Sequence, residues 1–429
     1  DMSARDSEIP ATTPGDRRAI VAAPMRVLVA DKFSPSGLEA LRALASEVTY
    51  RPELSAADLP AALAQGQVSV LVVRSTVVDA DALAATDRLS LVIRAGAGVN
   101  TIDLAAASKR GIFVANCPGK NAIAVAELTM GLLLALDRRI VDATVELRQG
   151  SWNKSKYGKA RGIKGQVLGL VGFGMIAREV ALRARAFGMK IQTYSPRGLD
   201  PETAERFGVQ ALPELRELLR TSDVVSVHVP YSASTHHLLS DDELAAMKPG
   251  ALLLHTARGG VVNDRALREA VASGRIRAGL DVFEDEPSEG KASYPSPLLA
   301  HEGVYATPHV GASTEQAEAA ISDEVIRIVR DYVVRGVVHN AVNVVTDRVA
   351  RYNLIVRHLD RVGVLAGILM ALRSEQLNVQ EMHNIIFARG EAACATITLE
   401  HRPSEELLAK LRGQDTVLAV ELRATAASA

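Results

Sequence analysis

The sequence predicts an α/β protein in which two doubly wound, Rossmann-like domains are followed by a small ferredoxin-like domain. Short β-branched runs alternate with helical patterns as far as residue 340, which is the order of parallel sheets covered by helices. A glycine-rich turn lies near the middle of this alternation, between an apolar strand and a helix. From residue 352 onward the pattern is strand, helix, strand, strand, helix, strand, which is typical of the βαββαβ ferredoxin-like fold.

Length and composition limit the possible function classes. The 429 residues suit about three domains, and 48% hydrophobic residues with a net charge of −1 are typical of globular cores. No basic excess suggests a nucleic-acid surface, and no apolar run reaches the roughly 18 residues of a membrane span. The two cysteines, Cys117 and Cys394, predict no disulfide framework and favour a reducing cytoplasm. Residues 1–24 are polar and proline-rich, and we expect a disordered tail there.

The first alternating unit contains no Gly-x-Gly-x-x-Gly turn, which indicates that it binds something other than a dinucleotide. Its strands are expected at Met25–Ala30, Val48–Tyr50, Val68–Val73, Leu91–Arg94 and Ile112–Ala115. Its helices are expected at Ser36–Leu44, Ala56–Ala64 and Leu104–Arg110. A long apolar helix pattern, Asn121–Ile140, then leads to the second unit.

The second unit opens on the strand Val167–Val171 and the turn Gly172-x-Gly174-x-x-Ala177, followed by a helix over Arg178–Phe187. The first glycine permits the turn, the second lets the backbone approach a pyrophosphate, and Ala177 lets the helix pack on the strand. The amides at the helix N-terminus then face the anion. An ordinary tight turn is the alternative, and the strand before it and the helix after it favour dinucleotide binding.

The later elements follow the same alternation and then change. Further strands of the second unit are expected at Lys190–Tyr194, Val224–Val229, Ala251–Ala257, Ala278–Phe283 and Val304–Thr307, with a returning helix at Ala317–Arg335. The third unit has expected strands at Leu354–His358, Val379–Ile386, Ala392–Leu399 and Val417–Leu422, and helices that reach Arg373 and span Ser404–Leu411. Ser404 is the expected N-cap of the last helix.

Three polar residues stand just beyond three strands of the second unit: Arg258, Glu286 and His309. Ligands bind at the carboxyl ends of strands in open α/β sheets. There an arginine offers a planar fork for a carboxylate, a histidine can carry a proton near neutral pH, and a carboxylate can orient that histidine. These roles suit reversible hydride transfer to a 2-oxo acid, with His309 as the proton donor. Glu284 and Asp285 are alternative carboxylates, and three unrelated surface groups are the simpler interpretation.

Four ordered segments carry a family resemblance: Gly172–Ala177, Thr256–Val262, Asp281–Pro287 and Thr307–Ser313. Together they resemble the signatures of the D-isomer-specific 2-hydroxyacid dehydrogenases. Arg74-Ser75-Thr76, Arg94–Asn100 and Trp152-Asn153-Lys154 resemble segments of the D-3-phosphoglycerate dehydrogenase branch, and the terminal unit resembles an ACT domain. The resemblance implies a substrate domain of residues 25–121 with a returning segment 309–340, a cofactor domain of 122–308, a linker of 341–351 and a regulatory domain of 352–429.

The resemblance also implies roles for individual residues. Arg258, Glu286 and His309 match the catalytic trio of the family. The implied contacts to NAD or NADP are Met175, Ile176, Thr256, Asp281 and Gly311. Further candidate contacts to the cofactor are the turn residues Gly172, Gly174 and Ala177, with Ser195, Arg197 and Ala257. The implied substrate contacts are Arg74, Ser75, Ala97, Gly98 and Arg258, and no metal ligand is implied. Arg138 matches a position that reaches the site of a neighbouring subunit, which fits a homodimer or homotetramer.

One departure from the family pattern bears on the cofactor. An acidic residue that binds the ribose hydroxyls of NAD is expected about 20 residues beyond the fingerprint, and Ser195 stands there instead. Losing that carboxylate removes repulsion against a 2′-phosphate, and Arg197 offers a partner for one. We therefore hypothesise that NADP is accepted and keep NAD as a nearly equal alternative, in which Ser195 still binds the ribose and Arg197 points into solvent.

The terminal unit resembles the serine-binding loop of ACT domains over His358–Leu365, with His358 and Asp360 as candidate effector contacts. Val362 replaces the usual proline, and Asp360 stands where asparagine is common, so a purely structural domain is the equal alternative.

The resemblance favours oxidation of D-3-phosphoglycerate to 3-phosphohydroxypyruvate in serine biosynthesis. Reduction of glyoxylate or hydroxypyruvate is a second enzymatic interpretation. A corepressor-like NAD(H)-sensing binding protein is a non-enzymatic alternative. The catalytic trio alone does not exclude it, because such proteins keep these three residues.

Overall fold

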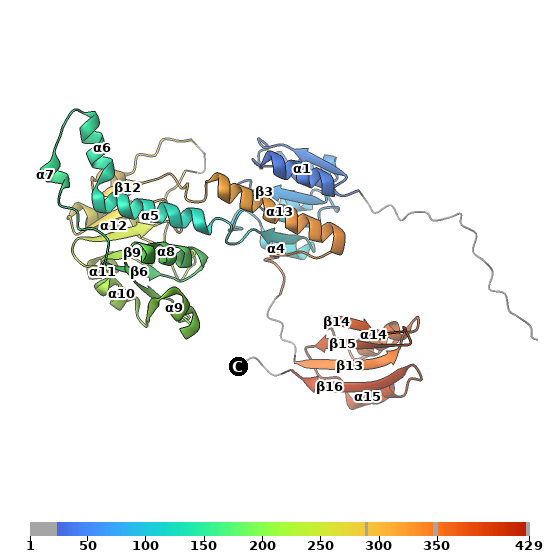
Figure 1. Cartoon of the computed structure of the whole chain (residues 1–429). Coiled ribbons are helices and arrows are strands. Elements are labelled where there is room, and N and C mark those ends of the chain that lie inside the picture. Colours follow the sequence, from blue (N-terminus) through green and yellow to red (C-terminus); the bar gives the residue numbers. More distant parts are fainter. Residues whose placement is uncertain (1–23, 288–290, 346–350, 426–429) are drawn as a thin grey trace, which may run out of the picture. The chain divides into compact units, whose positions relative to one another are not determined.

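The computed structural model describes residues 24–287, 291–345 and 351–425. It divides into two compact units, Asp1–Asn343 and Val344–Ala429, which we describe separately (Figure 1). Nearly all of the predicted tail, residues 1–23, lies outside the described residues.

The first unit begins with a five-stranded parallel sheet in the order β2-β1-β3-β4-β5. Its strands are β1 (Arg26–Val29), β2 (Glu47–Tyr50), β3 (Val70–Val73), β4 (Leu91–Arg94) and β5 (Phe113–Asn116). Its helices are α1 (Pro35–Leu44), α2 (Leu59–Gly66), α3 (Ala80–Ala84) and α4 (Leu104–Lys109). Separate clusters of buried side chains cover the two faces of the sheet, so β3 and β4 are apolar almost throughout, as the runs of β-branched residues predict.

A seven-stranded parallel sheet follows in the order β12-β11-β10-β9-β6-β7-β8. Its strands are β6 (Val167–Val171), β7 (Lys190–Tyr194), β8 (Val209–Leu212), β9 (Val224–Val227), β10 (Ala251–His255), β11 (Ile276–Leu280) and β12 (Val304–Ala306). Its surrounding helices are α5 (Ala122–Arg138), α8 (Met175–Ala186), α9 (Pro201–Phe207), α10 (Leu215–Thr221), α11 (Asp241–Ala246), α12 (Asp264–Ala272) and the 3₁₀ helix η1 (Pro297–Ala300). The strand order reverses between β6 and β9, and this is the place where doubly wound sheets bind their ligands.

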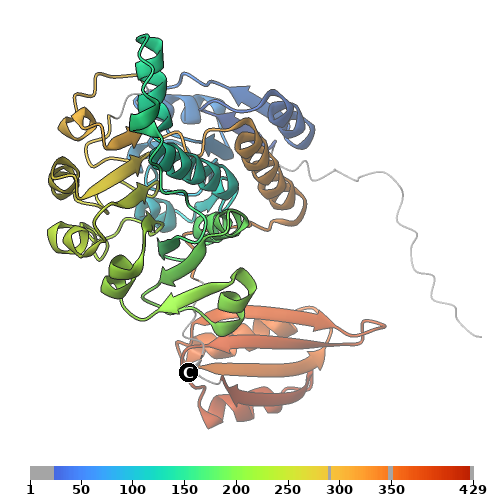
Figure 2. The ribbon, with the colours of Figure 1, turned by 60° about the vertical axis from the view of Figure 1, so that its left-hand side comes forward.

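The expected helix Asn121–Ile140 is corrected by the structure, which ends α5 at Arg138. Arg139 has a φ of 52°, a left-handed conformation that breaks the helix, and α6 (Ile140–Arg148) starts directly after it. A short helix, α7 (Lys154–Tyr157), completes this segment. In both views α6 extends away from the sheet (Figures 1 and 2), and it contributes no buried residue. α6 therefore adds no side chain to the hydrophobic core.

The helix α13 (Glu315–Arg335) returns the chain to the first sheet, where it packs beside α1. The chain then reaches the edge strand β5: Ala341 pairs with Ala115, and the Asn343 side chain accepts the N–H of Val114 at 2.8 Å. The first residues of the predicted linker 341–351 therefore belong to the first unit, and residues 346–350 lie outside the described residues.

The second unit has the predicted βαββαβ order. It consists of β13 (Tyr352–Leu359), α14 (Val364–Ser374), β14 (Val379–Ile386), β15 (Ala392–Leu399), α15 (Glu405–Arg412) and β16 (Val417–Ala424). The four strands form one antiparallel sheet, β14-β15-β13-β16. As predicted, Ser404 caps α15, because its hydroxyl accepts the N–H of Leu407 at 3.0 Å.

Two short elements of the seven-stranded sheet region, α9 and β8, were not predicted from the sequence. α9 spans only Pro201–Phe207, and β8 is a four-residue edge strand whose middle residues are exposed, so neither shows a clear apolar period.

None of the helices in the described ranges combines the length and the apolar character that a bilayer crossing needs.

Candidate active site

A histidine–carboxylate pair lies at the carboxyl edge of the seven-stranded sheet. His309 Nδ1 is 2.6 Å from Glu286 Oε2, and the other oxygen of Glu286 accepts the N–H of Phe283 at 2.9 Å. Since an ionised carboxylate only accepts hydrogen bonds, Nδ1–H of His309 is the donor, and its Nε2 is left for a ligand. The hydrogen bond to Glu286 outweighs burial and raises the pKa of His309.

The same pair explains the charge state of Glu286. Burial alone would raise the pKa of this carboxyl, but the hydrogen bonds from His309 and from the Phe283 N–H hold it below its ordinary value. Glu286 is therefore ionised at neutral pH and stabilises a protonated imidazole. The alternative carboxylate Glu284 points elsewhere, because its Oε1 is 2.7 Å from Nε2 of His237.

His309 is held in a costly backbone conformation by a buried aspartate. Its φ is 52°, in the left-handed region that residues with a Cβ rarely adopt. The carboxylate of Asp281, only 2% exposed, accepts the Thr307 hydroxyl at 2.6 Å and the N–H groups of Val310 and Gly311, each at 2.8 Å. Asp281 thus fixes the backbone on both sides of His309, and its predicted contact to the cofactor remains a prediction.

Arg258 reaches from the end of β10 toward the first sheet. Its Nη2 lies 3.7 Å from the place where a Cβ on Gly98 would stand, so the two predicted substrate contacts are neighbours. Its positive charge acts on both His309 and Glu286. The structure thus gathers the three predicted catalytic side chains in one place, together with the Gly98 loop.

Two further arginines, Arg94 and Arg74, lie at strand ends of the first sheet, and Arg94 is close enough to Arg258 for their charges to interact. The guanidinium of Arg94 folds over Gly96, which has no side chain to obstruct it, and its Nε donates to the Arg74 carbonyl at 3.0 Å. Burial, followed by the charges of Arg258 and Arg74, lowers the pKa of Arg94. The guanidinium of Arg74 itself pairs with Glu318 of α13 at 2.9 Å.

Sequence reasoning missed Arg94 and Asp31 as site residues. Arg94 ends a predicted strand, so the logic that selected Arg258 also applied to it. Asp31 follows β1 and accepts the N–H groups of Arg74, Ser75 and Thr76 at 2.6, 3.0 and 3.0 Å. Its role was not readable, because a carboxylate that accepts distant backbone amides leaves no local sequence signal.

The glycine turn has the shape that a dinucleotide requires. Gly172 has a φ of 91°, and a Cβ there would lie 2.9 Å from the His228 carbonyl oxygen. A Cβ on Gly174 would meet nothing within 4 Å, and no side chain caps the first turn of α8, which begins at Met175. Open space and uncapped helix amides in front of the turn fit a pyrophosphate.

The other predicted cofactor residues fall into two groups. Thr256, Ala257 and Gly311 are buried, and the Thr256 hydroxyl faces the hydroxyl of Thr129 at 2.9 Å. Arg197 is exposed beyond β7 and makes no hydrogen bond or ion pair within the described part of the chain, and Ser195 lies just before it. A partner for a negatively charged group is thus available at the end of β7. Contact between a cofactor and Thr256, Ala257 or Gly311 remains a prediction.

The candidate effector residues lie in the second unit. His358 is 1% exposed, and both ring nitrogens are engaged, Nδ1 with the Leu359 carbonyl at 2.8 Å and Nε2 with the Asn384 side chain at 3.1 Å. Asp360 is exposed at the end of β13. Of the two candidates, only Asp360 presents an unoccupied polar group.

Comparison with known proteins places this geometry in a family. Residues 130–311 match the model of the "D-isomer specific 2-hydroxyacid dehydrogenase, NAD binding domain". A hydroxypyruvate reductase of Thermotoga maritima is 46% identical over 262 residues, which are 61% of this chain and 83% of that protein. The chain belongs to the D-isomer specific 2-hydroxyacid dehydrogenases, a family of oxidoreductases that use NAD or NADP.

Two further similarities concern particular members of the family. A D-3-phosphoglycerate dehydrogenase of Methanocaldococcus jannaschii is 37% identical over 321 residues, 73% of this chain but only 59% of that protein. The crystal structure of an NADPH-dependent glyoxylate/hydroxypyruvate reductase of Sinorhizobium meliloti, in complex with NADP and malonate, aligns with a TM-score of 0.64 at 31% identity. That alignment covers 75% of this chain and 97% of the reductase.

Proposed function

We propose that this protein is an NAD(P)-dependent dehydrogenase that oxidises D-3-phosphoglycerate to 3-phosphohydroxypyruvate in serine biosynthesis, in the cytoplasm. The observation that carries the proposal is the 2.6 Å pair of His309 and Glu286, with Arg258 beside it at the carboxyl edge of the nucleotide-binding sheet. A base, a group that orients it and a carboxylate clamp are the parts that hydroxy-acid oxidation requires.

The turn Gly172–Ala177 would hold a nicotinamide dinucleotide, which would supply the acceptor for the hydride that leaves C2 of the substrate. Nε2 of His309 takes the hydroxyl proton in the oxidative direction and returns it in the reductive direction. Glu286 keeps the imidazole in the required tautomer and stabilises its protonated form. Arg258 holds the substrate carboxylate and polarises the carbonyl oxygen as it forms. The substrate thereby meets the base and the clamp in a single orientation.

The arginines of the first sheet support a substrate with a second anionic group. Arg94 has no acidic partner at hydrogen-bond distance within the described residues, and it lies close enough to Arg258 and Arg74 for their charges to lower its pKa. A phosphate at C3 of the substrate would relieve this repulsion, because guanidinium groups pair readily with phosphate oxygens. Glyoxylate has no such group.

The alternative enzymatic function, reduction of glyoxylate or hydroxypyruvate, also has support. The Thermotoga maritima relative is named as a hydroxypyruvate reductase, and the Sinorhizobium meliloti structure holds NADP. Ser195 in place of an acidic residue fits a cofactor that carries a 2′-phosphate. The chain also spans 59% of the phosphoglycerate dehydrogenase length, so the relatives leave the choice of substrate open.

A substrate panel decides between these enzymatic functions. Initial rates with 3-phosphohydroxypyruvate, hydroxypyruvate, glyoxylate and 2-oxoglutarate are measured with NADH and with NADPH. We expect the highest kcat/KM for 3-phosphohydroxypyruvate, and Arg94→Gln is expected to lower it about tenfold or more while leaving glyoxylate reduction nearly unchanged. A higher kcat/KM for glyoxylate or hydroxypyruvate favours the reductase function.

The non-enzymatic alternative is tested at His309. Proton transfer by a positioned side chain typically contributes about 10²–10⁴-fold, so His309→Ala is expected to lower turnover by that amount with little change in cofactor affinity. A corepressor-like sensor would show no turnover in the wild-type chain against any member of the panel.

We further propose that the second unit is an ACT-like regulatory domain and that the enzyme is a homodimer or homotetramer. The βαββαβ order of the second unit supports an ACT-like domain, and Asp360 is its candidate contact for the amino group of serine.

Exposed apolar residues of α6 support a subunit interface there: Ile140, Val141, Val145 and Leu147 are between 45% and 52% exposed. Arg138 at the end of α5 is the residue proposed to reach the neighbouring site. Light scattering measures the subunit count, and a serine titration tests the effector.

A further inference from the structure

An acidic residue of α13 holds the guanidinium of Arg74. Arg74 directly follows β3, and its Nη1 donates to Oε1 of Glu318 at 2.9 Å. Glu318 lies in the first turn of α13, which begins shortly after the loop that carries His309. The ion pair therefore joins the first sheet to the segment that follows the proposed catalytic histidine.

The backbone of Arg74 is fixed independently of its side chain. Asp31 accepts the N–H groups of Arg74, Ser75 and Thr76 at 2.6, 3.0 and 3.0 Å. The carbonyl of Arg74 in turn accepts Nε of Arg94 at 3.0 Å. Because these hydrogen bonds hold the end of β3 in place, a change of partner for the guanidinium requires only rotations about its side-chain bonds.

A cavity of about 380 Å³ gives this guanidinium room to change partners. Its lining includes Arg74, Glu318, Phe33, Ser322 and Ala95, the neighbour of Arg94. The side chains of Arg74 and Glu318 are 29% and 51% exposed. An ion pair that water reaches on both sides contributes little to stability, so a stronger anionic partner can replace Glu318.

A stronger partner would come from the substrate. Burial, followed by the charges of Arg258 and Arg74, lowers the pKa of Arg94, so both of these guanidinium groups lie within electrostatic range of Arg94. A substrate whose carboxylate pairs with Arg258 can direct a second anionic group toward Arg94 and Arg74. A phosphate there offers Arg74 two charge-assisted hydrogen bonds, and its negative charge repels the carboxylate of Glu318.

We propose that Glu318 is a specificity-determining residue that competes with the second anionic group of the substrate for Arg74. This inference rests on the proposed function, in which that group is the phosphate at C3. In the unliganded chain Glu318 holds the guanidinium of Arg74, and a phosphorylated substrate must displace it. Glu318 thus weakens the binding of phosphorylated substrates and leaves the binding of small 2-hydroxy acids without a phosphate unchanged.

The test measures ligand binding to the full chain by calorimetry, with the protein saturated with NADH or NADPH. D-3-phosphoglycerate is compared with D-glycerate, which lacks only the phosphate, and neither ligand reacts with a reduced cofactor. We expect Glu318→Gln to lower the Kd for D-3-phosphoglycerate about threefold or more and to change the Kd for D-glycerate by less than about twofold. In turnover, the KM for 3-phosphohydroxypyruvate is expected to fall with little change in kcat.

A double-mutant cycle connects this effect to Arg74. Arg74→Gln alone is expected to raise the Kd for D-3-phosphoglycerate about tenfold, because a charge-assisted partner of the phosphate is lost. Adding Glu318→Gln to Arg74→Gln is expected to change that Kd by less than about twofold, because the ion pair is already absent. A residue that only stabilises α13 would show the same effect in both backgrounds.

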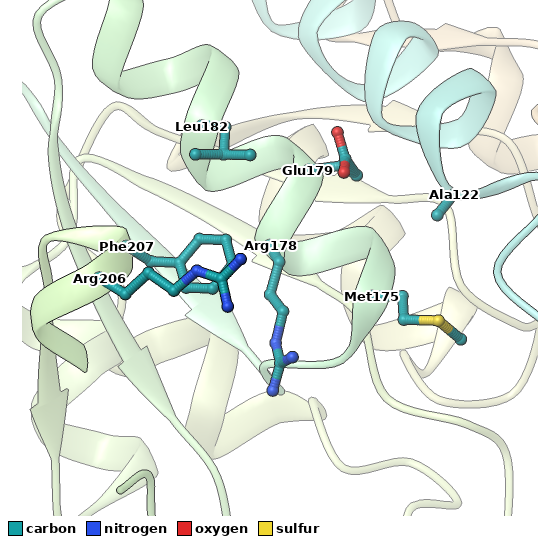
Figure 3. Close-up of a pocket in the computed structure, with 7 residues that line it drawn as sticks. All are labelled: Ala122, Met175, Arg178, Glu179, Leu182, Arg206 and Phe207. Carbon is teal, nitrogen blue, oxygen red and sulfur yellow. The ribbon is translucent and has the colours of Figure 1, made fainter. Parts of the chain in front are cut away.

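Two other glutamates provide matched controls. Glu315→Gln removes the same charge from the same cavity, one turn earlier on α13, and leaves the pair of Arg74 with Glu318 intact. Glu179→Gln breaks a comparable pair on α8, where Glu179 lies 2.6 Å from Arg183. Figure 3 shows Glu179 at a separate cavity of about 340 Å³. Each control is expected to leave both Kd values within about twofold of wild type.

Three results overturn the proposal. A higher Kd for D-3-phosphoglycerate in Glu318→Gln means that Glu318 positions Arg74 for the phosphate instead of competing with it. An equal change for both ligands assigns Glu318 to the site as a whole, and an affinity that is unchanged or undetectable in both chains excludes the competition. Because the titration requires no turnover, a chain that prefers glyoxylate but shows the phosphate-specific change rejects the proposed reaction and keeps the competition.

Discussion

In the proposed mechanism His309 acts through the proton on Nε2, and its hydrogen bond with Glu286 sets how tightly the imidazole holds a proton. The hydrogen bond between them raises the pKa of His309 above its ordinary value of about 6.5. The protonated form that reduction of a 2-oxo acid requires therefore persists to higher pH than in a free histidine. The kcat/KM for reduction should fall as pH rises through the elevated pKa of His309, and oxidation should show the opposite slope.

Replacing Glu286 tests this directly. In Glu286→Gln the negative partner is lost, so the inflection of the reductive pH–rate profile is expected to move to lower pH, with the largest loss of kcat/KM above neutral pH. Glu284→Gln is the matched control, since Glu284 pairs with His237 at 2.7 Å rather than with His309. An inflection that stays in place in Glu286→Gln contradicts the assigned pair.

Asp281 stabilises the backbone around His309. Asp281→Asn replaces an oxygen with an NH₂ group, which leaves at least one donor among Thr307, Val310 and Gly311 unpaired in a buried place. An unpaired buried donor costs about 1–3 kcal/mol, so we expect the free energy of unfolding in urea to fall by that amount, together with kcat. Asp285→Asn, two residues after Phe283 and exposed, is expected to change neither.

At the scale of elements, the two glycines of the turn before α8 have separable roles. Gly174 has a φ of −76° and open space at its Cβ position, so Gly174→Ala is expected to keep the melting temperature. The added methyl group occupies the space into which the pyrophosphate approaches, so the Kd for NADH and NADPH is expected to rise about tenfold or more. An unchanged Kd would mean that the dinucleotide lies elsewhere.

The loops after β10 and β11 contact each other closely at a third glycine. A Cβ on Gly259 would lie 1.7 Å from the Phe283 carbonyl oxygen, so Gly259→Ala must push apart the loops that carry Arg258 and Glu286. We expect a lower melting temperature and loss of turnover together, in contrast to Gly174→Ala. Normal turnover in Gly259→Ala would show that the two loops tolerate separation.

At the scale of the whole molecule, every residue proposed for catalysis and cofactor binding lies in the first compact unit, Asp1–Asn343. A chain that ends after Val345 keeps Asn343, whose side chain also donates to the Ile112 carbonyl at 2.8 Å. We expect this truncated chain to melt cooperatively, to bind NADPH with the affinity of the full chain and to lose any response to serine. Loss of NADPH binding on truncation would show that the second unit supports the cofactor site.

Much of this organisation was readable from residue patterns. The apolar runs located β3, β4 and β6, because strands buried on both faces are apolar along nearly their whole length. The strand–turn–helix context of Gly172 and Gly174 indicated a dinucleotide site, and the position of Arg258, Glu286 and His309 just after strands indicated one shared edge. Helix boundaries were less certain: α5 ends at Arg138 because Arg139 is left-handed, which an apolar sequence does not reveal.

The sequence by itself determined the alternation of strands and helices, the glycine turn and the candidates for the reacting groups, since these depend on local chemistry and spacing. Only the tertiary structure decided what each polar side chain contacts. It brought Glu286 rather than Glu284 to His309, placed Arg94 beside Arg258, and used Asp281 and Asp31 to hold distant backbone amides. The physical reason is that a hydrogen bond or an ion pair acts over a few ångströms, and the residues within that range of one another are separated by many positions in the chain.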